Sequence, residues 1–225
     1  MLYPIELRAR KHIMAHGSAR YADRMAGPIE IEVKIAVTSA ARVRAILRET
    51  KFSVVSPRVF EQNLVLDNAR GSVRSSGLLL RVRTSGKRNA RQAALCTFKG
   101  PATDTPTHHK QRVEREFTAS NADECLAVFA GIGFHPAFRY EKYRTVFARR
   151  ARRGEKGQQG LVTLDETPIG VFVELEGPAL WIDRTAKELG FSRNDYITVS
   201  YARLWERWRE EHALPPGNMV FSHRV

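Results

Sequence analysis

Apolar and charged residues alternate with a period of two at the start of the first strand that the chain predicts, residues 29–37. Successive side chains of a β-strand point to opposite faces, so Glu30, Glu32 and Lys34 share one face while Ile31 and Val33 share the other. A half-buried strand usually carries only scattered polar residues on its outer face. Two carboxylates and an ammonium in a row instead indicate a surface that holds an anion together with its metal.

The same charged alternation recurs in the strands expected at 78–84, 93–99, 111–117, 138–147, 161–166 and 171–177. In chain order, their charged faces carry Arg81 and Arg83; Thr97 and Lys99; Arg112, Glu114 and Glu116; Lys142 and Arg144; Thr163 and Asp165; and Glu174 and Glu176. A further strand region at 54–66 is expected to be interrupted by Pro57. One charged strand is more often a solvated face than a site, and it is the repetition that favours a site.

Helical patterns separate these strands. Thr38 or Ser39 is expected to cap a helix that reaches Thr50, and Ser120 or Asn121 to cap one that reaches residue 131. Two more helices are expected at 181–189 and 194–212. Their apolar sides can cover the apolar faces of the strands. We therefore expect an α+β fold in which an antiparallel barrel keeps its charged face inside and its helices outside, the reverse of the usual small barrel.

Composition places the chain among soluble proteins and separates three segments. It has 225 residues, 43% hydrophobic and 27% charged, with a net charge of +13. Such a charge favours polyanionic partners, but much of it lies in residues 7–24 and 149–153, so nucleic acid is not favoured. We expect a basic N-terminal arm at 1–28, disordered or helical, a tunnel domain at 29–212 and a tail at 213–225, in a monomer or a homodimer.

Cysteine usage and hydropathy bear on the compartment. Cys96 and Cys125 lack metal-binding spacing and are expected to be small core residues in a reducing environment. No run approaches the 18 apolar residues that a membrane helix needs, and residues 1–28 lack a secretory signal pattern. The expected location is the cytoplasm, without a membrane partner. His108 and His109 are expected at the surface.

The charged lining indicates its own ligand. Buried charges must be paired, hydrated or bound to ions. Carboxylates without His or Cys partners favour Mg²⁺ or Mn²⁺, and converging Arg and Lys side chains favour phosphate. Acids and bases at one site therefore predict a metal-bound polyphosphate, and with it phosphoryl or nucleotidyl transfer.

Seven segments in this order resemble a known family over about residues 29–205. They are Glu30-x-Glu32-x-Lys34, Leu80-Arg81-Val82-Arg83, Thr97-Phe98-Lys99-Gly100, Arg112-x-Glu114-x-Glu116, Lys142-x-Arg144, Leu164-Asp165 and Phe172-Val173-Glu174-Leu175-Glu176. The set resembles the CYTH-domain proteins, or triphosphate tunnel metalloenzymes. The resemblance implies an eight-stranded antiparallel barrel around a tunnel, and metal-dependent attack on a triphosphate.

The resemblance also implies a role for each position. It implies Mg²⁺ or Mn²⁺ ligands at Glu30, Glu32, Asp165, Glu174 and Glu176. It implies that the triphosphate is held by Lys34, Arg81, Arg83, Lys99, Arg112, Lys142 and Arg144. Glu114 and Glu116 would complete the metal shell or orient bases, and together with Lys34 they are the candidate catalytic residues.

The reaction itself is left open among several members of that family. The substrate would be inorganic triphosphate, ATP or thiamine triphosphate, and hydrolysis is slightly favoured because it is the simpler chemistry. One alternative is a class IV adenylate cyclase that makes cyclic AMP and pyrophosphate, since residues 60–67, 164–177 and Ser200-Tyr201 resemble bacterial proteins of that class. A second alternative is a polyphosphate- or RNA-binding module without turnover.

Overall fold

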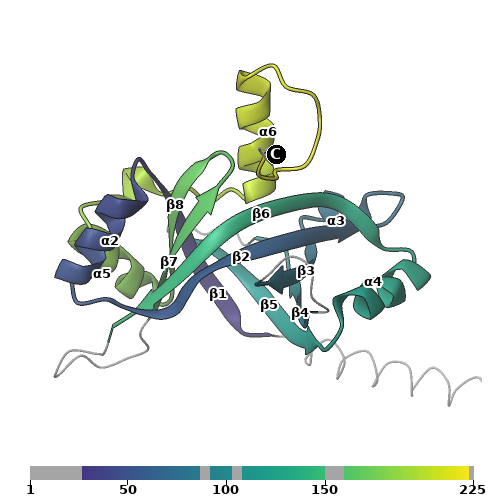
Figure 1. Ribbon diagram of the computed structural model, residues 1–225, viewed down its shortest axis with the longest axis horizontal. Coiled ribbons are helices and arrows are strands. Elements are labelled where there is room, and N and C mark those ends of the chain that lie inside the picture. The colour runs from purple at the N-terminus through teal and green to yellow at the C-terminus, as the bar shows by residue number, and fades with distance from the viewer. Residues whose placement is uncertain (1–26, 87–91, 103–107, 150–159, 223–225) are drawn as a thin grey trace, which may run out of the picture.

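The computed structural model describes residues 27–86, 92–102, 108–149 and 160–222. Eight antiparallel strands close into a barrel in the order β1-β5-β4-β3-β2-β6-β7-β8 (Figure 1). Their bounds are β1 Ile29–Val37, β2 Ser53–Asp67, β3 Leu79–Ser85, β4 Ala94–Lys99, β5 Lys110–Ala119, β6 His135–Ala148, β7 Leu161–Thr167 and β8 Gly170–Glu176. The predicted fold class, a closed eight-stranded antiparallel barrel with helices, is confirmed.

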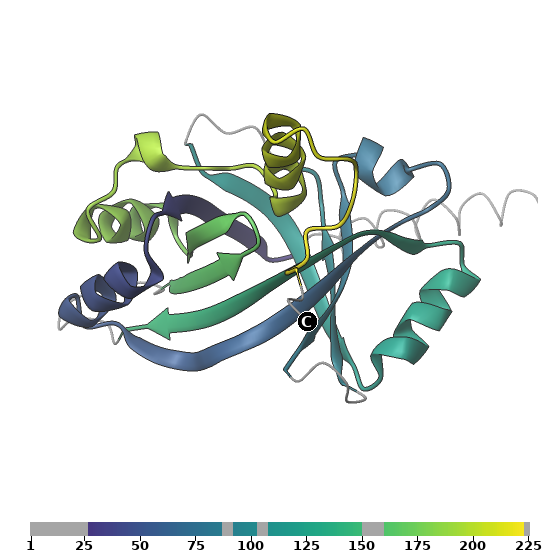
Figure 2. The same ribbon diagram turned by 45° about the horizontal axis from the view of Figure 1, so that its top comes forward.

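Helices cover the apolar outer faces of the strands, as the alternation predicts. Helices α2 (Ala40–Glu49) and α5 (Ala179–Glu188) lie at one end of the barrel, and α4 (Ala122–Gly131) lies at the other (Figures 1 and 2). The core at the first end includes Val33, Leu175 and Trp181, and Cys96 and Cys125 belong to the core at the α4 end. Both cysteines are free thiols and buried, as expected.

Two of the expected helix starts are fixed by side-chain caps. Ser39 accepts a hydrogen bond from the backbone N–H of Arg42 at the start of α2. Asn121 accepts from the N–H groups of Asp123 and Glu124 at the start of α4. These bonds satisfy donors that have no partner within the helix, which is why the helices begin there.

The chain differs from the prediction at Pro57. Strand β2 runs through it without a break, with register shifts against β6 between Val54 and Ser56 and between Ser56 and Val59. Proline cannot donate to a ladder, and a bulge lets the strand continue past it. The short helix α3 (Ser72–Ser75) was not predicted.

The helix expected to begin at Asn194 is wrong in its first part. Residues Arg193–Asp195 form a short 3₁₀ turn, and Ile197 then pairs with Lys34 through two backbone hydrogen bonds of 2.7 and 3.1 Å. Helix α6 (Tyr201–Glu211) begins only after Ser200, whose side chain caps it. β-Branched Ile197, Thr198 and Val199 favour the extended segment between the two.

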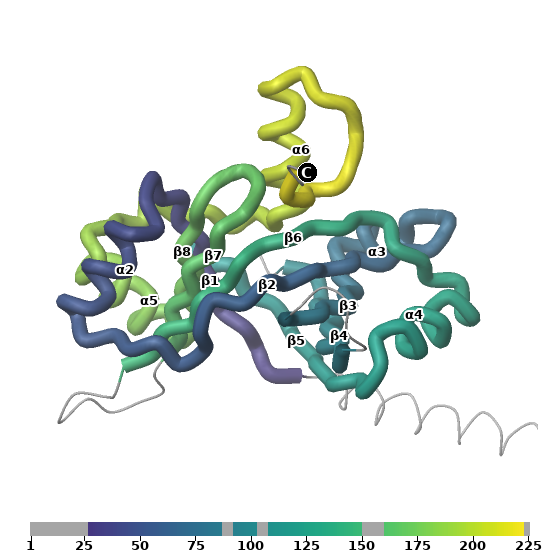
Figure 3. The backbone as a smooth tube through the Cα atoms, in the orientation of Figure 1, coloured from purple at the N-terminus to yellow at the C-terminus, as the bar shows by residue number. Residues whose placement is uncertain are grey.

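The chain after α6 returns to the barrel (Figure 3). Trp205 Nε1 donates to the carbonyl of Gly217 at 2.7 Å, and Met219 lies fully buried beside β6. The backbone of Met219 donates to Arg139 and accepts from Glu141. Strand β7 pairs with β6 only from Tyr143 onward, so this segment occupies the edge that β7 leaves open. In the described part of the chain, no helix is both long and apolar enough to cross a membrane.

Candidate active site

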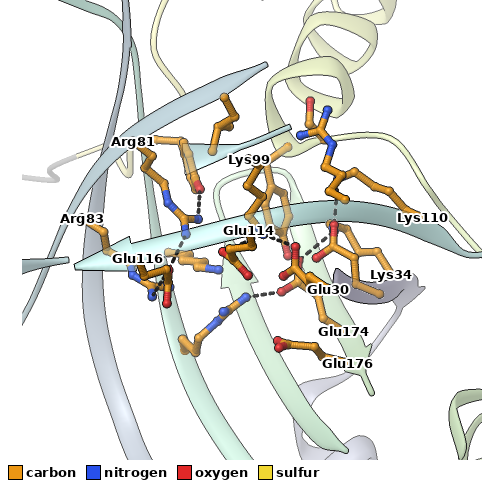
Figure 4. A pocket seen from close by; sticks show the side chains of 18 residues that line it. Glu30, Lys34, Arg81, Arg83, Lys99, Lys110, Glu114, Glu116, Glu174 and Glu176 are labelled. Atoms are coloured by element: carbon orange, nitrogen blue, oxygen red, sulfur yellow. Dashed lines mark hydrogen bonds and ion pairs between the residues drawn. The ribbon is translucent and has the colours of Figure 1, made fainter. Parts of the chain in front are cut away.

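The barrel encloses a charged cavity of about 150 Å³ (Figure 4). Its 18 lining residues are Glu30, Glu32, Lys34, Leu79, Arg81, Arg83, Lys99, Lys110, Arg112, Glu114, Glu116, Tyr140, Lys142, Arg144, Glu174, Glu176, Ser200 and Tyr201. Every site residue named from the sequence is among them except Asp165. The period-two argument thus places the charged faces correctly.

Strand register brings opposite charges side by side. Residues directly opposite in an antiparallel pair have their side chains on the same face. Lys34 lies opposite Glu174 between β1 and β8, Lys99 opposite Glu114 between β4 and β5, and Arg144 opposite Asp165 between β6 and β7. Each register therefore places one acid beside one base.

Two arginines of β3 are only loosely paired. Arg81 donates to Thr97 Oγ1 at 3.0 Å and to the Tyr140 hydroxyl at 3.2 Å. The ion pairs that Arg81 and Arg83 make with Glu116 are 3.8 and 3.9 Å long. Glu116 itself accepts a 2.7 Å hydrogen bond from Thr97. The guanidinium groups of this side of the cavity are thus available to an anion.

Asp165 lies behind the lining rather than in it. It is 0% exposed, and its carboxylate accepts from Arg144 (2.6 and 2.7 Å), from Lys142 (2.9 Å) and from the Tyr201 hydroxyl (2.8 Å). Burial raises its pKa, but Arg144 and Lys142 outweigh burial and hold that pKa below its ordinary value. Asp165 therefore stays ionised, with both oxygens engaged by donors.

Glu174 and Glu32 are also well neutralised. Lys34 Nζ lies 2.7 Å from Glu174, which Arg144 contacts as well. Burial opposes ionisation of Glu174, but Lys34 and Arg144 hold its pKa well below the ordinary value. Glu32 pairs with Lys110 at 2.7 Å, and Lys34 and Lys110 overcome burial to lower its pKa in the same way. Both carboxylates carry full charge.

The carboxylates of Glu30 and Glu176 behave differently. Burial, followed by the charge of Glu32, raises the pKa of Glu30 to about 7, although Lys99 contacts it. Burial and then the charge of Glu114 raise the pKa of Glu176. Lys99 also lies 3.2 Å from Glu114. Glu30 and Glu176 are thus two acids of the lining whose ionised forms are disfavoured by burial and by neighbouring carboxylates.

This donor set fits a hard divalent cation. It offers carboxylate oxygens without His or Cys, and a bound cation would stabilise the ionised forms of Glu30 and Glu176, whose pKa values are raised by burial first and by neighbouring carboxylates second. Within the described residues, however, no three acidic, His or Cys side chains are gathered closely enough to enclose an ion as they stand. The arrangement would have to tighten around a cation.

Sequence reasoning missed three contributors and misplaced one residue. Lys110 lies one residue before the strand predicted at 111–117, on the same face as Arg112, so a longer strand would have included it. Tyr140 lies within the strand predicted at 138–147, on the same face as Lys142, but it carries no charge and was not named. Tyr201 comes from the start of α6, which no strand period can reveal. His109, expected at the surface, is buried with Nε2 3.0 Å from Asp183 Oδ1.

The sequence model of the CYTH domain family matches residues 28–201. The chain belongs to the CYTH domain family. The matched region contains every residue of the cavity lining, and it ends on Tyr201. No curated protein sequence matches the chain.

Several solved structures share the fold at low sequence identity. A candidate adenylate cyclase from Vibrio parahaemolyticus superposes with a TM-score of 0.66 at 17% identity, covering 80% of this chain and 99% of its own. Protein PH1819 from Pyrococcus horikoshii gives 0.62 at 21% identity, covering 79% and 98%. A candidate adenylyl cyclase from Hippeastrum, HpAC1, described as having a dominant triphosphatase activity, gives 0.55 at 16% identity, covering 79% and 95%.

Proposed function

We propose that this CYTH protein is an enzyme that hydrolyses a triphosphate bound in the barrel cavity. One observation carries the proposal: the cavity has a basic half on β3 and β6 and an acidic half of six glutamates on β1, β5 and β8, in which the pKa values of Glu30 and Glu176 are raised. A triphosphate with a divalent cation has the matching distribution of charge. Its phosphate oxygens would meet the basic half and its cation the acidic half.

The basic half would hold the phosphate chain. Arg81 and Arg83 are loosely paired and can donate forked hydrogen bonds to phosphate oxygens. Lys142 and Arg144 are fixed by Asp165 and would act as positioned charges. Lys34 on β1, Lys99 on β4 and Arg112 on β5 lie at the other side of the same lining.

The acidic half would hold Mg²⁺ or Mn²⁺ through Glu30, Glu32, Glu174 and Glu176. When bound, the cation supplies charge neutralisation and polarisation of the phosphoryl oxygens. We assign Asp165, which the resemblance also implies as a ligand, to a different role, because its oxygens are occupied by Arg144, Lys142 and Tyr201.

Two further carboxylates take different roles in the proposal. Glu114 lies 3.2 Å from Lys99 and beside the acidic half, so we assign it to orient the attacking water. Glu116 accepts from Thr97 and faces Arg81 and Arg83, so we assign it to orient these bases.

The alternative is a class IV adenylate cyclase, the activity suggested for the Vibrio relative. A cyclase must hold adenine, yet among the described lining residues only Leu79, Tyr140 and Tyr201 offer apolar or aromatic surface. Both tyrosines are already engaged, Tyr140 with Arg81 and Tyr201 with Asp165. The description of the Hippeastrum relative also supports hydrolysis.

One experiment separates the possibilities. Purified protein is incubated with inorganic triphosphate, ATP or thiamine triphosphate, each with Mg²⁺ or Mn²⁺, and the products are resolved by ion-exchange chromatography. Orthophosphate that forms only with metal is the expected result. Cyclic AMP and pyrophosphate formed faster than orthophosphate would establish the cyclase instead. Binding without any product would leave a binding module, and RNA binding that weakens steeply with salt would indicate an RNA partner.

A further inference from the structure

Tyr201 joins the helix outside the barrel to the charged groups inside it. It is the first residue of α6, only 6% exposed, and it lines the cavity. Its hydroxyl donates to Asp165 Oδ2 at 2.8 Å. Its ring lies under two ammonium groups, with Lys34 Nζ 4.7 Å and Lys142 Nζ 5.3 Å from the ring centroid.

These contacts act on three of the bases that would hold the phosphates. An aromatic face attracts an ammonium within about 6 Å, and more strongly when both are shielded from water. One ring therefore favours a position in which Lys34 and Lys142 point toward the same side of the cavity. The same Asp165 oxygen that accepts from Tyr201 also accepts from Lys142 and Arg144, so the hydroxyl helps to fix Arg144 as well.

The surroundings hold Tyr201 itself in place. Its ring packs edge-on against Phe172, with the centroids 5.5 Å apart, and lies 5.9 Å from the ring of Tyr140. Ser200 caps α6, and Ile197 pairs with the backbone of Lys34 on β1. The start of α6 is thus tied to the strand that carries one of the two lysines.

We propose that Tyr201 is a positioning residue for the triphosphate reaction. Its ring sets the ammonium groups of Lys34 and Lys142, and its hydroxyl sets Asp165 and through it Arg144. The inference rests on the proposed function, and it gives α6 a part in the chemistry although the helix lies outside the barrel.

Two substitutions separate the ring from the hydroxyl. Tyr201→Phe keeps the aromatic face and removes the bond to Asp165, whereas Tyr201→Leu removes both and leaves an apolar side chain in the core. With inorganic triphosphate and Mg²⁺, we expect kcat/KM to fall about 10-fold in the Phe variant and about 100-fold in the Leu variant. The loss should lie mainly in kcat, because misplaced charges cost most in the transition state.

A matched control is available on the same strand as Lys142. Tyr143 packs against Phe60 and under Arg58 on the outside of the barrel, away from the cavity. Tyr143→Phe should keep the wild-type kcat and KM. Melting temperatures of all variants show whether a loss of rate follows a loss of folded protein. The Phe variant, which removes one oxygen, keeps the test usable if the Leu variant does not fold.

Calorimetric binding of inorganic triphosphate without metal is measured in parallel, and here the Leu variant is expected to bind more weakly than wild type. Wild-type kcat and KM in both Tyr201 variants would overturn the inference, as would a loss of rate that only follows the folded fraction. A wild-type protein that turns over no triphosphate would refute the proposed function instead. The binding measurement then decides the inference, which equal affinity in wild type and the Leu variant would overturn.

Discussion

Glu30 and Glu176 are the cavity carboxylates whose pKa values are raised, so their substitution is the sharpest test of the proposed cation site. Glu30→Gln and Glu176→Gln should each lower turnover by about 100-fold or more, because an amide is a poor ligand for a hard cation. Neither should lower the melting temperature, since burial and neighbouring carboxylates already disfavour the charge. Steady-state kinetics measures the loss of turnover, and calorimetry measures the melting temperature of each variant. Glu124→Gln, on the exposed side of α4, is the control, and full activity in both cavity variants would remove these residues from the site.

Arg83 and Arg144 should respond differently to truncation. Among the described residues, the ion pairs of Arg83 are long, 3.8 Å to Glu61 and 3.9 Å to Glu116, so Arg83→Ala should leave the fold intact. Its loss of binding should be about 1.5–3 kcal/mol, the value of a charged hydrogen bond, for every triphosphate alike. Arg144→Ala removes the ion-pair partner that buried Asp165 and Glu174 share, although Lys142 and Lys34 remain, and should lower stability by about 3 kcal/mol, the lower end of the cost of breaking a buried pair.

Kinetics and urea unfolding of both variants measure these effects. Loss of ATP turnover with retention of inorganic triphosphate turnover in Arg83→Ala would place Arg83 on the nucleoside instead.

At the residue scale, alternation along a strand was enough to identify which side chains face the cavity. It could not show which carboxylates are already neutralised, because that depends on which strands become neighbours. Asp165 and Glu176 look alike in sequence, yet the first meets Arg144 and Lys142 while the second meets Glu114. The role of Tyr201 could not be predicted for the same reason, since its contacts run from a helix to four strands, β1, β6, β7 and β8.

At the scale of elements, helix α3 depends on one carboxylate at the end of β2. Asp67 accepts hydrogen bonds from the backbone N–H groups of Asn68 (2.8 Å), Val73 (2.9 Å) and Arg74 (3.0 Å). Burial raises the pKa of Asp67, but these donors outweigh it and lower the pKa below the ordinary value. The ionised form is therefore favoured by folding.

The contribution of Asp67 should depend on pH with a definite sign. Because the folded-state pKa is lowered, the stabilisation is present above the unfolded pKa of about 3.9 and disappears as pH falls through the folded-state value. Asp67→Ala should cost about 1–2 kcal/mol at pH 7, as the loss of a helix cap does. The difference in free energy of unfolding between wild type and Asp67→Ala should become smaller when unfolding is measured at pH values closer to 3. A difference that stays constant with pH would mean that Asp67 acts through the shape of its side chain rather than through its charge.

The segment after α6 should stabilise the barrel. Met219 is 0% exposed, and its backbone supplies partners for Arg139 and Glu141 at the edge of β6. Met219→Ala should lower the free energy of unfolding by about 2–5 kcal/mol, as for other buried methionines. Val220→Ala, at a partly exposed neighbour, should cost much less. If urea unfolding gave equally small losses of free energy of unfolding for Met219→Ala and Val220→Ala, the segment would not be bound to the barrel.

Elements were predictable where local signals agreed and not where distant contacts decided. Ser39 and Asn121 mark real helix starts because a cap is a local device. Pro57 predicts a break in the strand, but the pairing of the rest of β2 with β6 outweighs the loss of one backbone N–H donor at the proline. Residues 196–200 were expected to be helical as part of the helix predicted at 194–212, yet their β-branched side chains and the pairing of Ile197 with Lys34 hold them extended.

At the scale of the whole molecule, residues 1–27 are predicted to be dispensable for the chemistry. They precede β1 and contribute nothing to the family match, which begins at residue 28. A chain shortened to begin near Gly27 should keep the kcat, KM and melting temperature of the full chain, as activity assays and calorimetry can measure. A fall of several degrees would show that the arm packs on the barrel.

Strand β1 lies between β5 and β8, so the first strand of the barrel gains its second neighbour only when the last strand has formed. Its residues Glu32–Val37 bond to Val171–Glu176, about 140 positions later. During synthesis the barrel cannot close until the ribosome has released β8, and contacts so distant in sequence make folding slow, on the order of milliseconds to seconds. In that interval the nascent strands expose a face of alternating charge as well as an apolar one. Such charges act as gatekeepers against aggregation, so the residues that later bind the ligand also keep the unfinished chain soluble.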